Sequence, residues 1–277
     1  MGENQGNLRL RFWGVRGSIP SPGHDTATYG GNTACVEVTA GHRTLIIDAG
    51  SGIRALGDKL AQNPTERVDV LFSHCHFDHI EGLPFFTPLY MSARPVNFWS
   101  GHIKSRNATR DMIASLIRAP YFPIDPSSFR AALIYHDFSA GDTLEPGEGI
   151  EVKTIALYHP GGATGFRISF NGRSLCYISD VEHRPAPDRA LVEFVTGTDF
   201  MIYDAMYKDE EYHRYVGFGH STWQEGIKLA NAAGVGTLAL YHHFPGRSDQ
   251  DLAKVEGLAA ASRPNTLMAR EGMEIDL

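Results

Sequence analysis

The chain has 277 residues, of which 42% are hydrophobic and 21% charged, and its formal net charge is −7. A soluble chain of this length and composition can bury a sizeable core without disulfides or structural metals. The acidic balance and the lack of a long basic run argue against a protein that grips long nucleic acid, since neutralising phosphates needs a basic face.

The cysteines and the N-terminus bear on the compartment. Cys35, Cys75 and Cys176 are few, far apart and odd in number, so a disulfide framework is not expected and a reducing compartment fits. The N-terminal sequence MGENQGNLRLRFWG has no apolar signal core, and the chain has no apolar stretch of about 18 residues. We therefore expect a soluble, cytoplasmic protein that does not contact a membrane.

Short strand-like segments alternate with a few helical ones along the chain. Two early strands flank a turn at Gly41 and predict a hairpin. The flanking helices and dominant strands predict a layered α/β (α+β) sandwich. In chain order, hydrophobic periodicity predicts strands at 8–13, 35–39 and 44–48, a helix at 53–63, strands at 68–72, 150–158, 165–170, 174–179 and 200–203, a helix at 222–233 and a strand at 237–241.

The segment from about 101 to 137 fits this alternation least well. It holds a helical stretch, ATRDMIASLIRA, followed by PYFPIDP, where three prolines break regular structure. We interpret it as an insertion that covers the active site, with a plain connector as the alternative.

The densest group of metal-ligating side chains is an HxHxDH pattern directly after the buried strand 68–72. Residues two apart on an extended segment point the same way, so His74 and His76 can approach one metal together. Asp78 and His79 lie just beyond, where the chain turns, and can reach a second metal. A cluster this dense favours a metal site over polar loop residues, and its donors suit zinc, manganese or iron.

Four side chains cannot hold two metals, because a binuclear site needs further ligands and a bridging carboxylate. His159, Asp180 and His242 each follow the end of a predicted strand, where loops gather and sites are built. Taken alone, each would be an ordinary polar residue at a strand end. Taken together, they supply the ligands that the first cluster lacks.

HxHxDH followed by a His, an Asp and a His at strand ends resembles the metallo-β-lactamase superfamily, from FWGVRGSIP to YHHFP. The resemblance implies a four-layer αββα sandwich over residues 1–277 as a single domain. Asp48 matches a structural aspartate of that fold, and His243 is an alternative to His242 as ligand. The implied ligands are His74, His76 and His159 for one metal, Asp78, His79 and His242 for the other, and Asp180 as the bridge.

A second motif, GHST at 219–222, precedes a predicted helix that Ser221 or Thr222 can cap. With HxHxDH it resembles the branch that contains the tRNA 3′-processing endonucleases (tRNase Z) and related phosphodiesterases. In that branch the residue matching His220 assists cleavage, and Asp204 could orient it. The alternatives are a capping or packing role for His220 and a buried structural role for Asp204.

The resemblance implies a hydrolase with two divalent metals, zinc foremost, in which a hydroxide shared by the metals attacks and His220 assists. Because the chain is acidic and lacks a Lys-rich arm that would clamp tRNA, we expect a small phosphodiester, such as a 3′,5′-cyclic nucleotide, and no long nucleic acid. The resemblance also implies a homodimer. The alternatives are tRNA 3′ processing, ester, lactone or thioester hydrolysis, and an inactive metal-binding module.

Two segments offer candidate substrate contacts. The Gly- and Pro-rich loop 18–32 could line the pocket, with polar contacts from His24, Tyr29 and Asn32. Aromatic residues in the 101–137 segment could stack on a base, and the candidates are Tyr121 and Phe122. The alternatives are exposed loop residues for the first group and core aromatics for the second.

Overall fold

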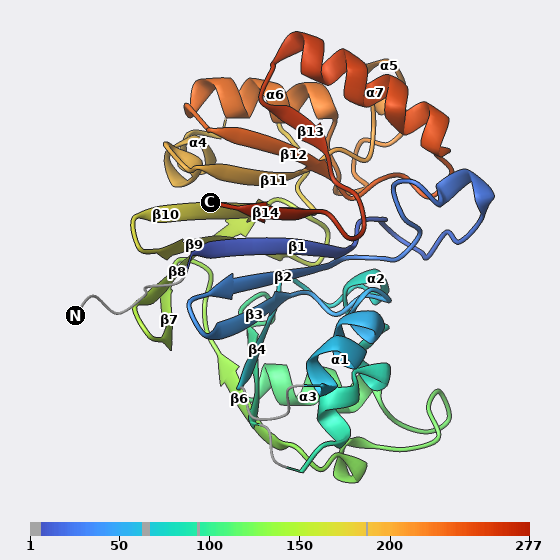
Figure 1. Cartoon of the computed structure of the whole chain (residues 1–277), viewed down its shortest axis with the longest axis vertical. Coiled ribbons are helices and arrows are strands. Elements are labelled where there is room, and N and C mark those ends of the chain that lie inside the picture. The colour runs from blue at the N-terminus through green and yellow to red at the C-terminus, as the bar shows by residue number, and fades with distance from the viewer. Residues whose placement is uncertain (1–6, 63–66, 93–94, 187) are drawn as a thin grey trace.

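The computed structural model of the protein describes residues 7–62, 67–92, 95–186 and 188–277. Its two seven-stranded sheets lie side by side in the middle of the molecule (Figure 1). In spatial order the first sheet contains β14 (Glu274–Asp276), β1 (Leu8–Gly14), β2 (Cys35–Ala40), β3 (Arg43–Ile47), β4 (Val68–Phe72), β5 (Pro95–Ser100) and β6 (Ala132–Asp137). The second contains β13 (Thr266–Met268), β12 (Thr237–Tyr241), β11 (Phe200–Asp204), β10 (Arg173–Ile178), β9 (Ala163–Phe170), β8 (Ile150–Leu157) and β7 (Thr143–Gly147).

Helices cover the outer face of each sheet, as Figure 1 shows. The first sheet carries α1 (Ile53–Ala61), α2 (Phe77–Ile80) and α3 (Ala108–Leu116). The second carries α4 (Arg189–Val195), α6 (Trp223–Ala232) and α7 (Asp249–Ser262), with the short α5 (Asp209–Tyr212) nearby. The 3-10 turns are η1 (His24–Thr26), η2 (Leu83–Phe85), η3 (Thr87–Tyr90) and η4 (Pro126–Ser128).

Three apolar clusters fill the spaces between these layers. The cluster between the sheets includes Phe12, Phe166 and Tyr177, all fully buried. A second cluster joins α4, α6 and α7 to the second sheet, and a third joins α1 and α3 to the first sheet. The expected four-layer αββα sandwich is therefore confirmed.

Strand direction determines where the functional side chains gather. In the first sheet β3 and β4 run parallel, and in the second β10, β11 and β12 run parallel. Parallel strands end at the same edge of a sheet, and in open α/β sheets this edge is where ligands bind. The segments that leave these strands carry most of the predicted ligands.

The predicted strands at 68–72 and 237–241 match β4 and β12 residue for residue. The helix predicted at 53–63 ends at Ala61, and residue 63 lies outside the described residues. The sequence analysis did not predict α7, whose first turn is capped by the Ser248 hydroxyl accepting from the Asp251 amide. Its small alanines do not form the narrow apolar stripe that periodicity detects.

The 101–137 segment departs from the expected insertion. It contains α3 and ends in β6, which pairs in parallel with β5, so it is a strand–helix–strand connection within the first sheet. The three prolines interrupt the chain between α3 and β6, which hid the strand from sequence analysis. Its first loop, 101–107, reaches toward the functional edge, where the centroid of the His102 ring lies 6.4 Å from that of His74.

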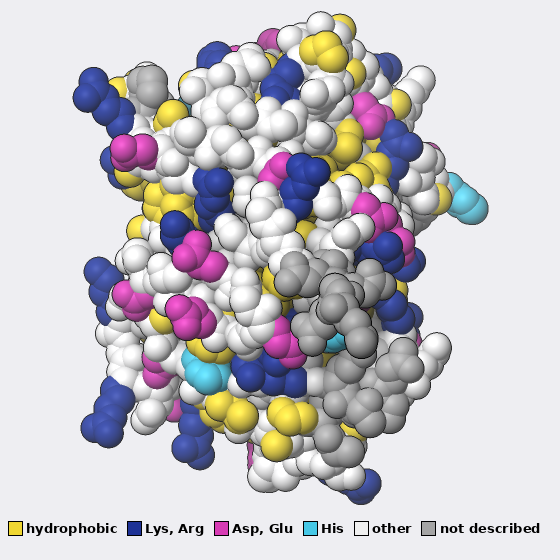
Figure 2. All heavy atoms as spheres, turned by 60° about the vertical axis from the view of Figure 1, so that its left-hand side comes forward, with side chains coloured by type: hydrophobic (Ala, Val, Ile, Leu, Met, Phe, Trp, Pro, Cys, Tyr) yellow, Lys and Arg dark blue, Asp and Glu magenta, His cyan; other side chains and the backbone are white. Residues whose placement is uncertain are grey.

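Lys and Arg side chains are interspersed with Asp and Glu side chains on the face in Figure 2. None of the helices in the described part of the chain is long and apolar enough to cross a membrane.

Asp69 on β4 offers a test of what holds the first sheet together. Its buried carboxylate accepts from Arg43 at 2.5 Å, Arg67 at 2.7 Å and the Trp99 indole at 3.0 Å. We expect Asp69→Ala to lower the free energy of unfolding by about 3 kcal/mol, because it leaves these donors without their buried acceptor. Urea unfolding followed by circular dichroism measures this. Asp276→Ala, which breaks an exposed pair with Arg9, is the control, and equal midpoints for both variants would contradict the prediction.

Candidate metal centre

Seven predicted ligands, drawn from both sheets, meet at one edge of the sandwich. The segment after β4 supplies four of them, and the ends of β8, β10 and β12 supply one each. All lie in groups whose donor atoms fall within 4.8 Å of one another. These ligands are His74, His76, Asp78, His79, His159, Asp180 and His242.

Asp180 lies between two sets of imidazoles. Its Oδ1 is 3.8 Å from His74 Nε2 and 3.9 Å from His159 Nε2. Its Oδ2 is 3.2 Å from His79 Nε2 and 3.4 Å from His242 Nε2. Each oxygen thus faces a different set, which is the arrangement that a carboxylate shared by two cations requires.

The first set consists of His74, His76 and His159. His159 Nε2 lies 3.0 Å from His76 Nδ1, and the His74 ring packs edge-on against both partners. Burial lowers the pKa of each of these three imidazoles, so they are neutral near pH 7 and carry free lone pairs.

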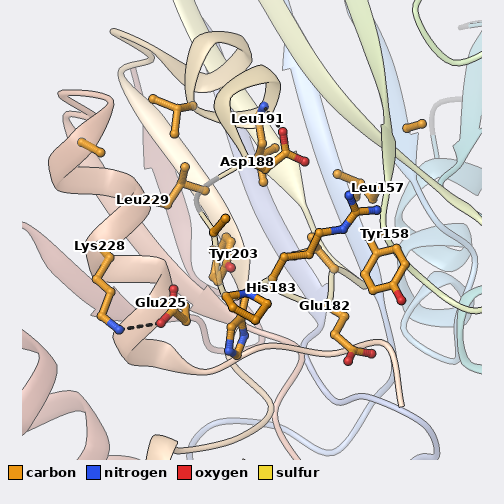
Figure 3. Close-up of a pocket in the computed structure, with 17 residues that line it drawn as sticks. Leu157, Tyr158, Glu182, His183, Asp188, Leu191, Tyr203, Glu225, Lys228 and Leu229 are labelled. Atoms are coloured by element: carbon orange, nitrogen blue, oxygen red, sulfur yellow. Dashed lines mark hydrogen bonds and ion pairs between the residues drawn. The ribbon is translucent and has the colours of Figure 1, made fainter. Parts of the chain in front are cut away.

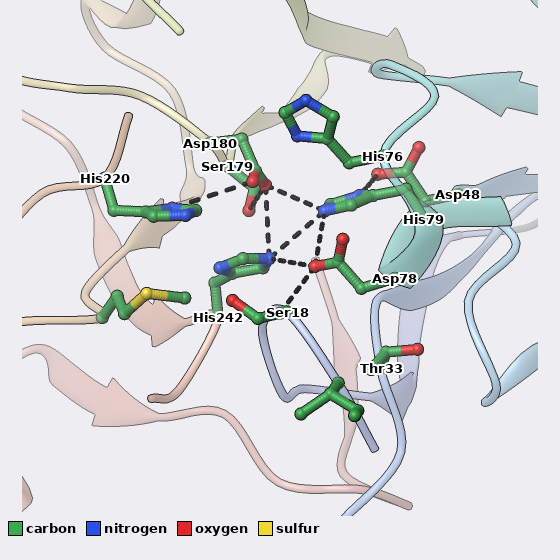
Figure 4. A network of polar contacts seen from close by, with 12 residues as sticks. Ser18, Thr33, Asp48, His76, Asp78, His79, Ser179, Asp180, His220 and His242 are labelled. Carbon is green, nitrogen blue, oxygen red and sulfur yellow. Dashed lines mark hydrogen bonds and ion pairs between the residues drawn. The ribbon is translucent and has the colours of Figure 1, made fainter. Parts of the chain in front are cut away.

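The second set consists of Asp78, His79 and His242. His242 Nε2 is 3.1 Å from Asp78 Oδ2 and 3.2 Å from His79 Nε2 (Figure 4). His243 points elsewhere, because its Nε2 donates to the Ala269 carbonyl at 2.8 Å. The geometry therefore selects His242 over His243 as the member of this set.

Neighbouring groups fix which nitrogen of two ligands faces the centre. His79 Nδ1 donates to Asp48 Oδ2 at 2.8 Å, and the same carboxylate accepts from the Tyr177 hydroxyl. His159 Nδ1 donates to the Gly219 carbonyl at 2.7 Å. In both residues Nε2 is left as the lone-pair donor, which is how proteins orient metal-binding histidines. Asp48 is thus a supporting residue, as the sequence analysis expected.

Three side chains at this edge stand on left-handed backbone. The φ angles are 62° at Asp48, 60° at Asp180 and 59° at His242, each within two residues after a strand. Non-glycine residues adopt this region at a cost of about 1–3 kcal/mol, and such residues cluster at functional sites. The turn aims each side chain back over its strand end.

Divalent cations fit this donor set. His74 Nε2 is buried with no hydrogen-bond partner among the described residues, although it faces Asp180 Oδ1. Nε2 of His79 and of His242 face each other and the two carboxylates of this site. These lone pairs and carboxylates converge with too few protons between them, so bound cations would balance their charge. Imidazole together with carboxylate suits first-row divalent metals.

His220 lies beside this cluster, at the N-terminal end of α6. Its Nδ1 donates to Asp204 Oδ2 at 2.8 Å, and its ring stacks on His242 with centroids 5.0 Å apart. Burial works against the charged ring, but the Asp204 carboxylate raises the pKa of His220 to about 9. Asp204 also accepts from the Asp180 amide at 3.1 Å, so it positions the bridge as well as His220.

The five candidate substrate contacts lie in the 18–32 loop and in the 101–137 segment. The buried Tyr29 hydroxyl donates to Glu256 at 2.7 Å, and the Asn32 side chain donates to Glu271 at 2.9 Å, so both tie the 18–32 loop to the C-terminal part of the chain. Of the remaining candidates, His24 is exposed on η1, Tyr121 is 80% exposed, and Phe122 packs edge-on against Phe85.

Two contacts at the centre were not predicted. The Ser18 amide, at a φ of 62°, donates to Asp78 Oδ2 at 2.7 Å. The Glu182 carboxylate accepts from the amides of Gly217 at 2.7 Å and Gly219 at 2.8 Å. A backbone amide carries no sequence signal, and for Glu182 the only signal is its place two residues after a ligand.

A separate cavity of about 460 Å³ lies behind this edge, between α4 and α6 (Figure 3). His183 and Tyr203 on its wall share the Ser221 hydroxyl, which lies 2.9 Å from each. Ser221 follows His220, so these contacts hold the start of α6 in place.

The comparisons with known proteins agree with this geometry. The model of the family described as the beta-lactamase superfamily domain matches residues 43–243. Ribonuclease Z of Gemmatimonas aurantiaca is 26% identical over 324 aligned residues, which cover 98% of this chain and 96% of that protein.

Solved structures show the same fold. The metallo-β-lactamase fold protein YhfI of Bacillus subtilis matches with a TM-score of 0.74 and 17% identity, covering 98% of this chain and 99% of that one. The short form of human tRNase Z matches with a TM-score of 0.69 and 18% identity, covering 96% and 98%.

The expectation that long nucleic acid is not a partner was wrong. Relatives that match almost the whole chain are named Ribonuclease Z, so the acidic total does not separate this chain from proteins that act on RNA. A total charge also says little about the field at one edge of a protein, which nearby groups dominate. With the family model, the seven clustered donors and the αββα sandwich in agreement, the chain belongs to the metallo-β-lactamase superfamily and is a metal-dependent hydrolase.

Proposed function

We propose that this protein is a phosphodiesterase that hydrolyses phosphodiester bonds in RNA and uses two zinc ions. The observation that carries the proposal is the Asp204–His220 pair, which lies beside Asp180 with His220 Nδ1 3.7 Å from Asp180 Oδ1. Cleavage of a phosphodiester with an alkoxide leaving group gains from an acid at this place that protonates the leaving oxygen. The relatives named Ribonuclease Z support RNA as the substrate.

The ligand assignment follows the two sets of side chains. Asp180 would be shared by the two ions, His74, His76 and His159 would hold one ion, and Asp78, His79 and His242 would hold the other. Divalent ions held there would supply Lewis-acid chemistry, which draws charge from phosphate oxygens and lowers the pKa of a bound water. Zinc suits the imidazole-rich donor set, with manganese and iron as the other metals of similar preference.

The side chains around the centre divide the remaining work. His220, held by Asp204, presents its Nε2 proton for donation to the leaving oxygen. The same contact keeps the ring in one tautomer, as a carboxylate partner does for a catalytic histidine. The Ser18 amide holds Asp78 in place.

A panel of substrates at defined metal content tests the proposal. We expect the zinc-loaded protein to cleave a short single-stranded RNA and bis(p-nitrophenyl) phosphate faster than p-nitrophenyl acetate or a lactone. cAMP and cGMP belong in the panel, because the sequence analysis predicted cyclic nucleotides. Turnover of the acyl compounds alone would refute the phosphodiesterase assignment.

Metal content tests the bridging role of Asp180. We expect about two divalent ions per chain in the purified protein and no more than one in Asp180→Ala, because the variant loses the carboxylate that both sites share. Mass spectrometry of acid-digested protein measures the ratio. His24→Ala, which removes an exposed histidine, is the matched control and should keep both ions. Two ions in Asp180→Ala would contradict the assignment.

His220 should matter for turnover and not for metal binding. We expect His220→Ala to reduce kcat on RNA by roughly 10²–10⁴-fold, the usual contribution of a positioned general acid. Asp204→Asn should give a smaller loss, since the amide can still accept from Nδ1. Activity on bis(p-nitrophenyl) phosphate should fall less, because its p-nitrophenolate leaving group needs little protonation. Equal losses on both substrates would contradict the acid role.

Glu182 is a positioning residue, because it holds the Gly219 amide while the Gly219 carbonyl orients His159. We expect Glu182→Gln to weaken zinc affinity by roughly 10–100-fold, as loss of an outer partner of a metal-binding histidine does. Competition with a zinc chelator measures affinity, and a thermal melt without metal checks that the fold is unchanged. Glu193→Gln on α4 is the exposed control. Unchanged zinc affinity in Glu182→Gln would overturn this role.

A further inference from the structure

The segment that follows β5 has a net positive charge, although the chain as a whole is acidic. It comprises a loop, a helix and turns. We call residues 101–131 the basic segment. It holds five basic and two acidic residues, in a chain whose net charge is −7. Lys104 and Arg106 are exposed, and neither forms an ion pair with another described residue.

Lys104 and Arg106 line a groove of about 940 Å³ beside the metal centre. Asp137 and Asp142 also line it, but their carboxylates are engaged with the backbone. Asp137 accepts from the amide of Thr109 at 2.9 Å, and Asp142 accepts from that of Ser139 at 2.8 Å. Both carboxylates keep their charge but face peptide amides, whereas Lys104 and Arg106 are exposed and have no ion-pair partner among the described residues.

A turn without side chains joins this groove to the metal centre. Gly161 and Gly162 follow His159 and have φ angles of 82° and 85°. A Cβ added at Gly161 would lie 3.9 Å from His76 Nε2, and one added at Gly162 would lie 3.8 Å from the His102 carbonyl. Gly162 lines the groove, so a chain held at the metals can continue into it across this turn.

An aromatic side chain stands at the rim of the centre. Phe77, between the ligands His76 and Asp78, is 75% exposed. Proteins that bind single-stranded nucleic acid combine a basic groove that follows the backbone with exposed aromatic rings on which bases stack. The two unpaired cations of the groove and the exposed ring of Phe77 are groups of these two kinds.

We infer that the groove binds single-stranded RNA that flanks the scissile phosphate, with Lys104 and Arg106 contacting its phosphates and Phe77 stacking on a base. The inference rests on the proposed function and adds the direction in which the substrate extends. It identifies the substrate as a strand of several nucleotides, because a single nucleotide held at the metals would leave Lys104 and Arg106 unused.

The test compares a Lys104→Glu/Arg106→Glu double variant with the wild-type protein, both zinc-loaded, on a single-stranded RNA and on bis(p-nitrophenyl) phosphate. We expect KM for RNA to rise at least tenfold and kcat/KM for bis(p-nitrophenyl) phosphate to stay within about twofold. The log–log dependence of RNA affinity on salt should become shallower by about 1.4, since two phosphate contacts are lost.

Two further variants sharpen the result. Lys254→Glu/Arg189→Glu changes the charge equally on α7 and α4, away from the groove, and should leave KM for RNA unchanged. Phe77→Ala should weaken RNA binding by about fivefold or more, the effect of losing one stacked base.

The outcomes separate the inference from the proposed function. Unchanged KM and salt dependence in the groove variant, with RNA still cleaved, would overturn the groove and leave the phosphodiesterase standing. Equal effects of both double variants would overturn it as well, because the effect would then be one of total charge. Absence of turnover on every phosphodiester by the zinc-loaded wild type would instead refute the proposed function.

Discussion

The arrangement of this edge depends on the mutual repulsion of buried donors. Four buried imidazoles, two buried carboxylates and the exposed imidazole of His76 bring their lone pairs together at this edge. Burying a polar atom without a partner is unfavourable, and neutral His74 with its unpaired Nε2 shows that protons alone do not satisfy this site. Bound cations would satisfy these lone pairs. This requirement explains why Asp48, Asp204 and Glu182 hold the surrounding groups in place.

The candidate ligands could be identified in the sequence because they follow buried strands. The ends of the apolar run at 68–72 and of the strand at 237–241 are evident in the sequence. The polar residues after them could therefore be placed at one edge before the fold was known. The choice between His242 and His243 was closer, since both follow β12, and the Ala269 carbonyl that engages His243 comes from a distant part of the chain.

The sequence analysis could not anticipate contacts that depend on a later segment of the chain. Tyr29 lies in a loop that seemed free to line a pocket, but α7 returns to this loop and Glu256 takes its hydroxyl. The strand β6 was hidden because its apolar residues follow prolines and its sheet partner β5 was not predicted. Net charge misled for a related reason, because it is a sum over the chain and contains nothing about which residues become neighbours.

The candidate ligands of the centre come from both sheets, and this has a consequence for the sandwich as a whole. His74, His76, Asp78 and His79 leave the first sheet, whereas His159, Asp180 and His242 leave the second. Metal ions bound between these side chains would link the two sheets, in addition to the apolar contacts between the sheets. The concentration of free metal therefore sets part of the stability of the folded sandwich. A ligand that binds only the folded form stabilises it in proportion to the logarithm of the ligand's concentration.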